Sequence, residues 1–347
     1  MKLDPLTQKK IRRFKSIRRG YYSFLLFGLF LLVTIFAELL VNNRAIVVYD
    51  GESIYLPTYR SMIPGTTFGL DYQYETNYRD LKTYFAKKGR SGFVLLPLVP
   101  YNAFEIDLKT KQYPPFPPSF EDSHYLGTDE IGRDIIARLV YGFRICIVFS
   151  LLLLIINFSI GITLGCLMGY LGGKFDILFQ RIIEIWSSVP FLYVIMIISS
   201  IIVPNLIILV LISVFFGWMG MTWYMRTITY KEKSRDYVLA AKTLGASNTR
   251  IIFRHILPNS ISLIVTFIPF SIAGGISSLT ALDYLGFGLP APTPSWGELL
   301  QQGTHNLQSP WIISAIVTAL VLVMVSITFI GEGIREAFDP KLHSVYE

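Results

Sequence analysis

The sequence predicts an all-α polytopic membrane protein with six transmembrane helices and a small mixed extracytoplasmic insert. Composition is the first reason, since 52% of the 347 residues are hydrophobic and only 16% are charged, as in integral membrane proteins. The second is a set of long runs without Asp, Glu, Lys or Arg, because about 20 apolar residues span a bilayer as a helix. These runs are 145–173, 185–225, 256–282 and 306–331, with a shorter one at 20–37.

The six helices are placed from these runs. Run 185–225 is long enough for two crossings, and Pro204-Asn205 supplies a turn at its middle. Helix one resembles a signal peptide because a basic segment precedes it. However, its apolar stretch exceeds the usual core of about 7–15 residues, and no Ala-x-Ala-like site follows Leu40, so an uncleaved anchor is predicted. The helices are expected near 21–41, 145–169, 184–203, 206–225, 260–282 and 312–332.

Lys and Arg near the helix ends predict the orientation. Residues 1–19 contain eight Lys or Arg and one acidic residue, and the loop 226–255 contains seven Lys or Arg and two acidic residues. The loop 283–311 contains no Lys or Arg. Both termini and the 226–255 loop should therefore face the cytoplasm, with the protein a multi-pass component of the bacterial inner membrane. The net charge of +7 then reflects the orientation of the chain in the lipid membrane, and no nucleic-acid partner is expected.

Residues 42–144 should form the extracytoplasmic insert. Ala45–Tyr49 and Glu52–Leu56 flank Asp50-Gly51, a strong hairpin signal. Phe93–Val99 is a third candidate strand, and the proline-rich segment 113–118 should be an extended strap. At the end of the insert, residues 129–143 predict an amphipathic helix that lies on the outer membrane surface or packs against the insert. Its apolar face would hold Ile131, Ile135, Ile136, Leu139, Val140 and Phe143, and its polar face Arg133, Asp134 and Arg138.

Small residues and aromatic residues mark two further features. Gly161, Gly165 and Gly169 recur every fourth residue in helix two, which predicts a close contact with another helix. Cys146 and Cys166 lie in the same helix about 30 Å apart, so they cannot form a disulfide within one chain. The loop 281–311 carries aromatic residues that would form an interfacial belt, or an irregular loop packed over the bundle. These residues are Tyr284, Phe287, Trp296 and Trp311.

The polar, basic segment 234–259 has the plan of a helix–turn–helix. Ala240, Ala241 and Leu244 fall on one helical face, and Gly245 permits the left-handed backbone that ends a helix. Ser247 or Asn248 can cap the second helix, and Pro258 ends it or begins the next element. Its apolar positions are Ile251, Ile252 and Ile256. Because predicted transmembrane helices flank this segment on both sides, we expect it to bind a protein partner at the membrane surface and not DNA.

These residues resemble the EAA loop of type I ABC importer permeases. Ala240, Ala241, Gly245, Leu257 and Pro258 match its spacing, whereas Leu239 replaces the family's Glu and His255 replaces an Ile. The strings GTDEIGRD, RHILPN, LDYLGFGLP and PSWGELL resemble the dipeptide/oligopeptide C-type branch. YDGESIYLP and GFVLLPLVPYNAFEIDL, before the strap, are similar to YejE-type permease subunits of the oligopeptide/microcin C importers of Gram-negative bacteria.

The resemblance implies a permease core at 145–332, between cytoplasmic tails at 1–20 and 333–347. It implies a heterodimer with a paralogous permease, a cytoplasmic ABC ATPase that uses ATP and Mg, and a periplasmic peptide-binding protein. The loop 226–259 would couple the permease to the ATPase. Its coupling residues would be Asp236, Tyr237, Ala240, Ala241, Leu244, Gly245, Ala246 and Pro258.

Catalytic chemistry is not expected of this chain. Gly173-Lys174 is no P-loop, because Met168 stands where the first glycine would be and Phe175 replaces the Ser or Thr. No G-x-S-x-G or H-E-x-x-H motif occurs, and the four histidines are scattered, so no catalytic residue, metal or bound cofactor is predicted. A secondary carrier usually has ionisable groups at helix centres, and here Glu38, Glu184 and Glu332 lie near helix ends.

The sequence therefore predicts the permease subunit of an ATP-driven oligopeptide importer. Peptide-nucleotide antibiotics such as microcin C are a narrower hypothesis for its substrates. A permease for nickel or another small solute is the alternative. A secondary carrier or a channel is a weaker one, since a channel needs no basic helix–turn–helix between two spans.

Overall fold

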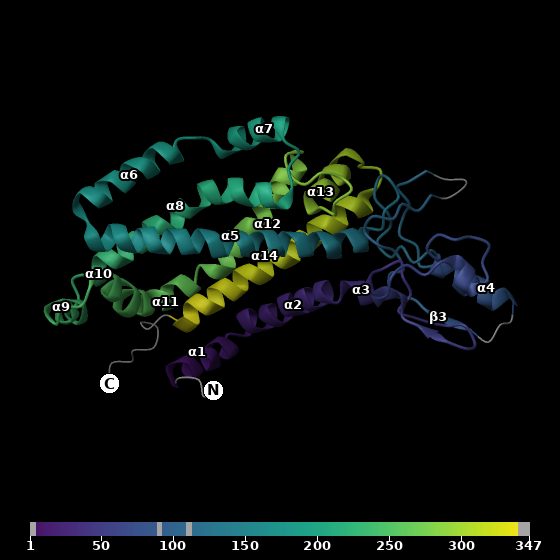
Figure 1. Cartoon of the computed structure of the whole chain (residues 1–347), viewed down its shortest axis with the longest axis horizontal. Helices are drawn as coiled ribbons and strands as arrows, with labels where there is room; N and C mark the ends of the chain where they lie inside the picture. Colours follow the sequence, from purple (N-terminus) through teal and green to yellow (C-terminus); the bar gives the residue numbers. More distant parts are fainter. Residues whose placement is uncertain (1–4, 89–91, 109–112, 339–347) are drawn as a thin grey trace.

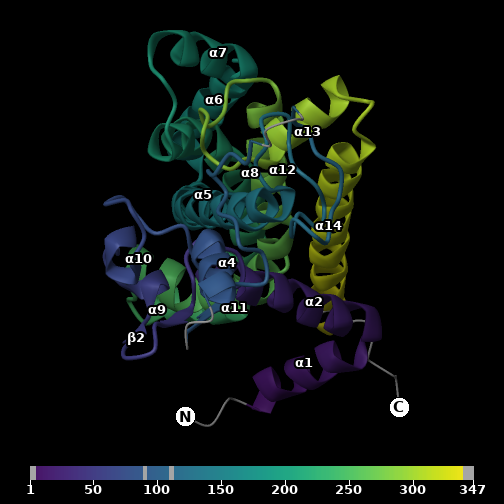
Figure 2. The same cartoon turned by 90° about the vertical axis from the view of Figure 1, so that its right-hand side faces the viewer.

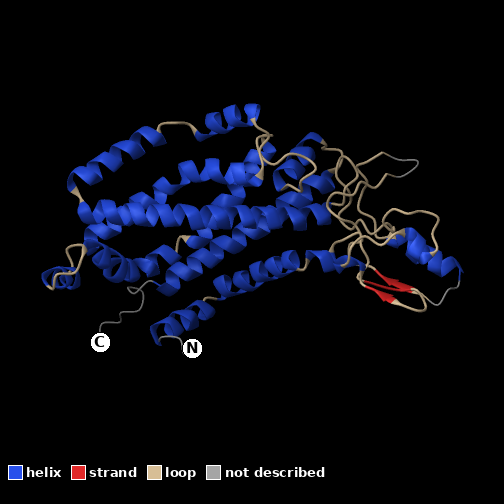
Figure 3. Ribbon diagram, in the orientation of Figure 1, coloured by secondary structure: helices blue, strands red, loops and turns tan. Residues whose placement is uncertain are grey.

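The computed structural model describes residues 5–88, 92–108 and 113–338. It is an elongated bundle of helices with a small domain at one end and the short helix α9 (Asp236–Thr243) at the other (Figure 1). Strands occur only in the small domain among these residues (Figure 3). The predicted fold class, an all-α membrane protein with a small mixed insert, is confirmed.

Within the residues that the structure describes, four helices are long and apolar enough to cross a membrane by themselves. They are α2 (Arg18–Ile35), α5 (Ile135–Leu171), α8 (Leu206–Glu232) and α14 (Pro310–Phe338). Two bent pairs pass the same test, which gives up to six spans. The first pair is α6 (Gly173–Ser187) with α7 (Phe191–Ile201), bent by 65°, and the second is the helical run 248–265 with α12 (Ile268–Tyr284), bent by 58°.

The bends differ from the straight helices expected at 184–203 and 260–282. Each break is followed closely by a proline, Pro190 before α7 and Pro269 in the first turn of α12. Proline has no N–H to donate and disfavours helical backbone at the preceding residue. Both views show α6 and α7 as an outer arm on the opposite side of α5 from α1 (Pro5–Ser16) and α2 (Figures 1 and 2).

The core of the bundle is built around α5. Phe149 of α5, Leu209 of α8, Leu279 of α12 and Ile316 of α14 are all inaccessible to solvent and belong to one apolar cluster. Helix α2 packs along α14 and continues into the short helix α3 (Ala37–Leu40). Helix α5 runs from the insert at one end of the molecule toward the α9 end (Figure 1).

The insert contains a three-stranded antiparallel sheet of order β2-β1-β3. Its strands are β1 (Val47–Tyr49), β2 (Ile54–Tyr55) and β3 (Phe93–Leu95). The predicted hairpin around Asp50-Gly51 is confirmed by the pairing of β1 with β2. The backbone amides of Ser53 and Glu52 donate to the Asp50 carboxylate and lower its pKa. Helix α4 (Tyr78–Lys88) and two 3₁₀ turns, η1 (Pro57–Tyr59) and η2 (Gly65–Phe68), complete this domain.

The helix predicted at 129–143 begins six residues later than expected, and of its two alternatives the structure supports packing against the insert, because Ala137 and Val140 share an apolar cluster with Val99 and Ala103. Residues 126–134 precede the helix, which begins at Ile135 and continues without interruption into the membrane span. Asp134 caps it by accepting from the Ala137 amide at 2.8 Å. Arg133 and Arg138, expected on a polar face, are 1% and 0% exposed, because carboxylates rather than water surround them.

The 281–311 loop packs over the bundle, and Trp296 shows how. It begins α13 (Trp296–His305), is 2% exposed, stacks on Phe143 at a centroid distance of 5.5 Å and donates its indole N–H to the Leu139 carbonyl. The two alternatives for this loop were an interfacial aromatic belt and a loop packed over the bundle. Trp296 fits the packed loop, whereas Tyr284 and Trp311 are only partly buried.

Candidate functional site

The helix–turn–helix lies at the extreme end of the molecule, opposite the insert (Figure 1). It consists of α9, α10 (Asn248–Arg250), a π-helical segment η3 (Ile251–Ile256) and α11 (Leu257–Val265). The Ser247 hydroxyl accepts from the Arg250 amide and caps the second helix, as predicted. A separate apolar cluster attaches this end to the bundle. It contains Val238, Ala241, Ile251, Ile252 and Ile256 together with Tyr170 of α5 and Met225 of α8.

Gly245 ends α9 in the left-handed conformation expected, with a φ of 78°. Its amide donates to the Lys242 carbonyl, and the next amide, of Ala246, donates to the Ala241 carbonyl, each at 3.0 Å. This pair of bonds is the Schellman arrangement that closes a helix at a glycine. Ala241 and Ala246 both contact the apolar cluster, so the turn is held from its inner side. A Cβ at Gly245 would meet no atom within 4 Å, and only the backbone conformation requires glycine.

Pro258 does not end a helix. It lies in the first turn of α11, and the helical run continues through it from residue 248 to residue 265. A proline ring clashes with the carbonyl four residues earlier. Arg254, whose carbonyl would meet the ring in a regular α-helix, lies in the preceding π-helical segment, where backbone hydrogen bonds span five residues and not four. Ile251, Ile252 and Ile256 of this segment all belong to the apolar cluster.

One face of α9 and its C-terminal end are exposed to solvent. Leu244 is 87% exposed and Leu239 52% exposed, although both are apolar. Ala240 and Asp236 are exposed beside them, whereas Tyr237 is half-buried and donates to Glu232 at 2.7 Å. The expected face of Ala240, Ala241 and Leu244 is therefore divided, because only Ala241 turns inward. Leu239, which replaces the family's Glu, belongs to the exposed surface.

Gly161, Gly165 and Gly169 all lie where α5 crosses α8. A Cβ added at Gly165 would come within 2.5 Å of the Thr222 carbonyl oxygen and 2.7 Å of the Met225 Cβ. At Gly161 it would come within 2.7 Å of the Met221 Cβ. Such distances are shorter than side chains tolerate, so the two helices approach this closely only because the side chains are missing. The sequence signal located this contact but did not identify its partner helix.

At the end of α5 nearest the insert, four charged side chains form a cluster in which Asp129, Arg133 and Arg138 are buried and Glu298 is partly buried. Arg133 contacts Asp129 through Nε and Glu298 through a terminal nitrogen, each at 2.6 Å. Arg138 contacts the second oxygen of Glu298 and lies 3.5 Å from Asp129. Arg138 also donates to the Ala103 carbonyl of the insert at 3.2 Å. The cluster thus joins the insert, α5 and α13 at one place.

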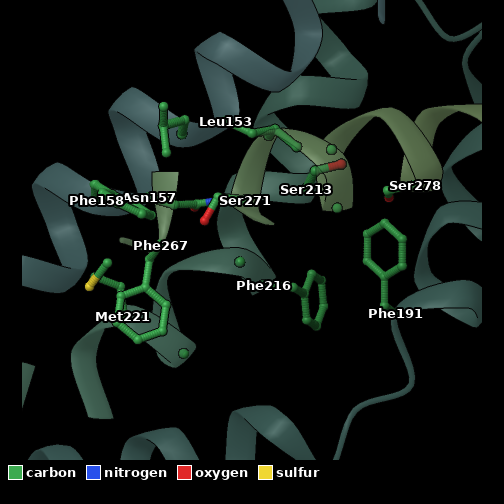
Figure 4. Close-up of a pocket in the computed structure, with 15 residues that line it drawn as sticks. Leu153, Asn157, Phe158, Phe191, Ser213, Phe216, Met221, Phe267, Ser271 and Ser278 are labelled. Carbon is green, nitrogen blue, oxygen red and sulfur yellow. The ribbon is translucent and has the colours of Figure 1, made fainter. Parts of the chain in front are cut away.

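A cavity of about 580 Å³ opens between α5, α7, α8 and α12 within the bundle. Its lining includes four aromatic rings, Phe158, Phe191, Phe216 and Phe267, shown around it in Figure 4. Its polar lining side chains are Asn157, Ser213, Ser271 and Ser278, and the described lining contains no charged residue. No pattern in the sequence predicts this pocket, because residues from separate spans form it and no single span carries a polar motif.

The chain is similar to known transport proteins over most of its length. The family model for the inner membrane component of binding-protein-dependent transport systems matches residues 161–344. The inner membrane ABC transporter permease protein YejE of Escherichia coli (strain K12) is 40% identical over 98% of both chains. The peptidoglycan transport system permease protein YejE of Agrobacterium fabrum is 36% identical over 97% of this chain and 94% of the relative.

A third relative, the dipeptide transport system permease protein DppC of Lactococcus lactis, is 38% identical over 64% of this chain and 65% of its own length. The near-complete coverage by the two YejE proteins includes the insert. The chain therefore belongs to the binding-protein-dependent ABC transporter permeases of the inner membrane, in their YejE-type branch, and is a non-catalytic membrane subunit.

Proposed function

We propose that this permease conducts oligopeptides across the inner membrane as part of an ATP-driven importer, and that its α9–α11 loop docks on a separate cytoplasmic ATPase. The single observation that carries the docking proposal is the exposed apolar surface of Leu239 and Leu244 on the outermost helix. Exposed leucines at a polar, basic tip are disfavoured by water, and contact with a partner removes them from it.

The coupling residues would act in two groups. Asp236, Ala240, Leu244 and the turn at Gly245 would contact the ATPase, while Ala241, Ala246 and half-buried Tyr237 would hold α9 in place. Pro258 would act through the wide turn before it. Because the cluster beneath α9 includes residues of α5 and α8, a movement of α9 would be passed to those two spans. ATP and Mg would act in the ATPase, and the bundle would change access by rigid-body motion.

The remaining partners follow from the family. A binding-protein-dependent permease works with an ATPase and a binding protein, and we propose a paralogous permease as the second membrane subunit. The basic residues of α1 and of the 226–255 loop support a cytoplasmic location for this end of the molecule and for both termini. The binding protein would then meet the opposite end, which carries the insert.

Oligopeptides are the substrate class that the relatives' names and the pocket support together. The relatives are named for peptidoglycan, dipeptide and oligopeptide transport. A pocket lined by apolar and uncharged polar side chains suits peptides of varied side chains better than a metal ion, which would seek His, Cys or carboxylate ligands. Microcin C, a peptide-nucleotide, is a narrower hypothesis within this class, and nickel is the alternative that the same assay tests.

Replacement of Leu244 by Asp tests the docking surface. Because the side chain is 87% exposed, the variant should insert and fold as the parent does. A charge in the apolar contact should weaken ATPase binding about 10-fold or more, measured by co-purification at graded ATPase concentrations. The matched control is Leu307→Asp, a 73% exposed leucine between α13 and α14 at the other end of the molecule. Equal ATPase recovery by the two variants would place the docking surface elsewhere.

A further inference from the structure

Helix α1 carries a row of basic side chains on the side that faces away from the bundle. Lys9, Arg12 and Lys15 are exposed, and none of them pairs with a residue that the structure describes. Residues 5–19 contain seven Lys or Arg and no Asp or Glu. We propose that this row binds the headgroups of anionic phospholipids in the leaflet on its side of the membrane, and that the bound lipid holds the ATPase-docking loop in position through α11. Only the second part rests on the proposed function.

The opposite side of α1 is attached to the bundle, which fixes the direction of the basic row. The half-buried ring of Phe14 packs against Gly333 of α14, where an added Cβ would come within 3.0 Å of it. Lys10 donates to the Ser262 hydroxyl of α11 at 2.7 Å and lies 4.4 Å from the centre of the Phe338 ring. Both views show α1 on the outside of the bundle and not among its helices (Figures 1 and 2).

Helix α1 lies at the depth of the lipid headgroups. The uncharged run 306–331 of α14 ends at Glu332, which Arg19 approaches to 3.6 Å, so this pair marks the edge of the hydrocarbon. Phe338, beside Lys10, is six residues farther along α14 and therefore about 9 Å or less beyond that edge. The headgroup layer is about 5–8 Å thick on each side of a bilayer. The row on α1 is thus within reach of lipid phosphates.

The charge of the row selects anionic lipid. Several Lys or Arg directly before a membrane span attract anionic headgroups, about 5-fold in affinity for each side chain near the surface. A zwitterionic headgroup carries an ammonium of its own and offers no net charge to the row. Ile11, which is apolar and 42% exposed beside the row, suits the boundary between headgroups and acyl chains. An acidic protein surface would first have to displace the lipid at this depth.

The bond between Lys10 and Ser262 connects this lipid contact to the docking loop. Ser262 lies in α11, and the helical run 248–265 that contains it follows directly on the turn at Gly245. Lipid that holds α1 against the membrane therefore also fixes α11. Release of α1 should loosen the loop and lower ATPase-driven transport.

The lipid contact is tested by counting bound lipid. The complete importer is placed in nanodiscs of phosphatidylcholine with about 30% phosphatidylglycerol, an anionic lipid, and native mass spectrometry counts the molecules of each that it retains. The triple variant Lys9→Gln/Arg12→Gln/Lys15→Gln should lower the ratio of retained phosphatidylglycerol to phosphatidylcholine by about 5-fold or more. The charge-keeping variant Lys9→Arg/Arg12→Lys/Lys15→Arg should keep the parent's ratio.

Two controls separate this contact from other effects of charge. Arg60→Gln/Lys82→Gln/Lys87→Gln removes the same charge from exposed positions of the insert and should keep the parent's ratio. A triple glutamine variant of α1 with that same ratio would overturn the lipid contact. Weaker ATPase co-purification by this variant in detergent without anionic lipid would also overturn it, because the row would then meet the ATPase.

Uptake with ATP in vesicles with and without phosphatidylglycerol tests the connection to the loop. The parent should transport labelled oligopeptide faster with the anionic lipid, and the triple glutamine variant should lose that difference. Lys10→Met and Ser262→Ala should lose it too while retaining as much phosphatidylglycerol as the parent. If both keep the parent's difference, α1 does not act through α11. A parent that takes up no peptide in either membrane overturns the proposed function and leaves the lipid count to decide the contact.

Discussion

At the scale of single residues, backbone conformation and exposure matter more than chemical reactivity. Gly245 is required by its φ of 78° and not by crowding. Leu239 and Leu244 are exposed where water disfavours them. The family's Glu is absent, so a carboxylate at position 239 cannot contribute to docking here, and the contact should depend more on apolar burial and less on salt than a charged contact would.

Replacement of Gly245 by Val should weaken coupling without preventing insertion. A β-branched side chain is disfavoured at positive φ by about 1–3 kcal/mol, and the turn would rearrange to relieve that cost. Gly245→Asn is the matched control, because Asn tolerates the left-handed region. We expect reduced ATPase co-purification and reduced uptake for Val and near-parental values for Asn. If Val and Asn behave alike and both transport normally, the turn has no coupling role.

At the scale of elements, α5 is the helix to which the rest attaches. The glycine-lined contact fixes it to α8, and the charge cluster joins its N-terminal end to α13 and the insert. The apolar cluster of α9 reaches its C-terminal end. A span attached in this way moves as one body, and a displacement of α9 is expected to reach the membrane pocket through it.

The charge cluster predicts a large effect from a small change. Glu298→Gln would leave Arg133 and Arg138 buried with one carboxylate, Asp129, between them. Breaking a buried pair costs about 3–5 kcal/mol, and about 3 kcal/mol is expected here because a glutamine oxygen still accepts one bond. A lower midpoint of thermal unfolding in detergent would show it. Glu130→Gln, at an exposed neighbouring position, should leave the midpoint unchanged, and equal midpoints for both variants would contradict the argument.

Local features could be predicted from the sequence, and features that depend on distant partners could not. The hairpin at Asp50-Gly51 and the turn at Gly245 depend on a few consecutive residues, and both were predicted. The burial of Arg133 and Arg138 depends on Glu298, which is 160 residues from Arg138 along the chain. Helical periodicity therefore placed both arginines on the polar face of a helix, without indicating the carboxylates that surround them. The membrane pocket could not be predicted for the same reason, because most of its lining residues come from three separate helices, α5, α8 and α12.

At the scale of the whole molecule, the two ends differ in chemistry. The basic loop and α1 lie at one end, and the insert lies at the other (Figure 1). Between them the four helices that can each cross a membrane alone have uncharged centres, whereas α6 carries Asp176, Arg181 and Glu184 along its length. This division is the arrangement expected of a subunit that takes energy from a partner on one side and substrate from a partner on the other.

Reporter fusions test the orientation of this division. Fusions at Lys15, Tyr101 and Arg250 should place only the Tyr101 reporter outside, because the eight Lys and Arg of residues 1–19 and the seven of the 226–255 loop favour the cytoplasm. An outside report from Arg250 together with Tyr101 would contradict the model of six spans.

The central claim is that this chain transports peptides only within an ATP-driven assembly. Proteoliposomes that contain the permease pair, its ATPase and its binding protein would be supplied with labelled oligopeptide, and with either ATP or a proton or sodium gradient. Uptake should require ATP and the binding protein and should be absent with either gradient alone. Uptake driven by a gradient without ATP would contradict the claim. Stimulation of ATP hydrolysis by a metal-loaded binding protein, and by no peptide-loaded one, would retain the mechanism and replace the substrate.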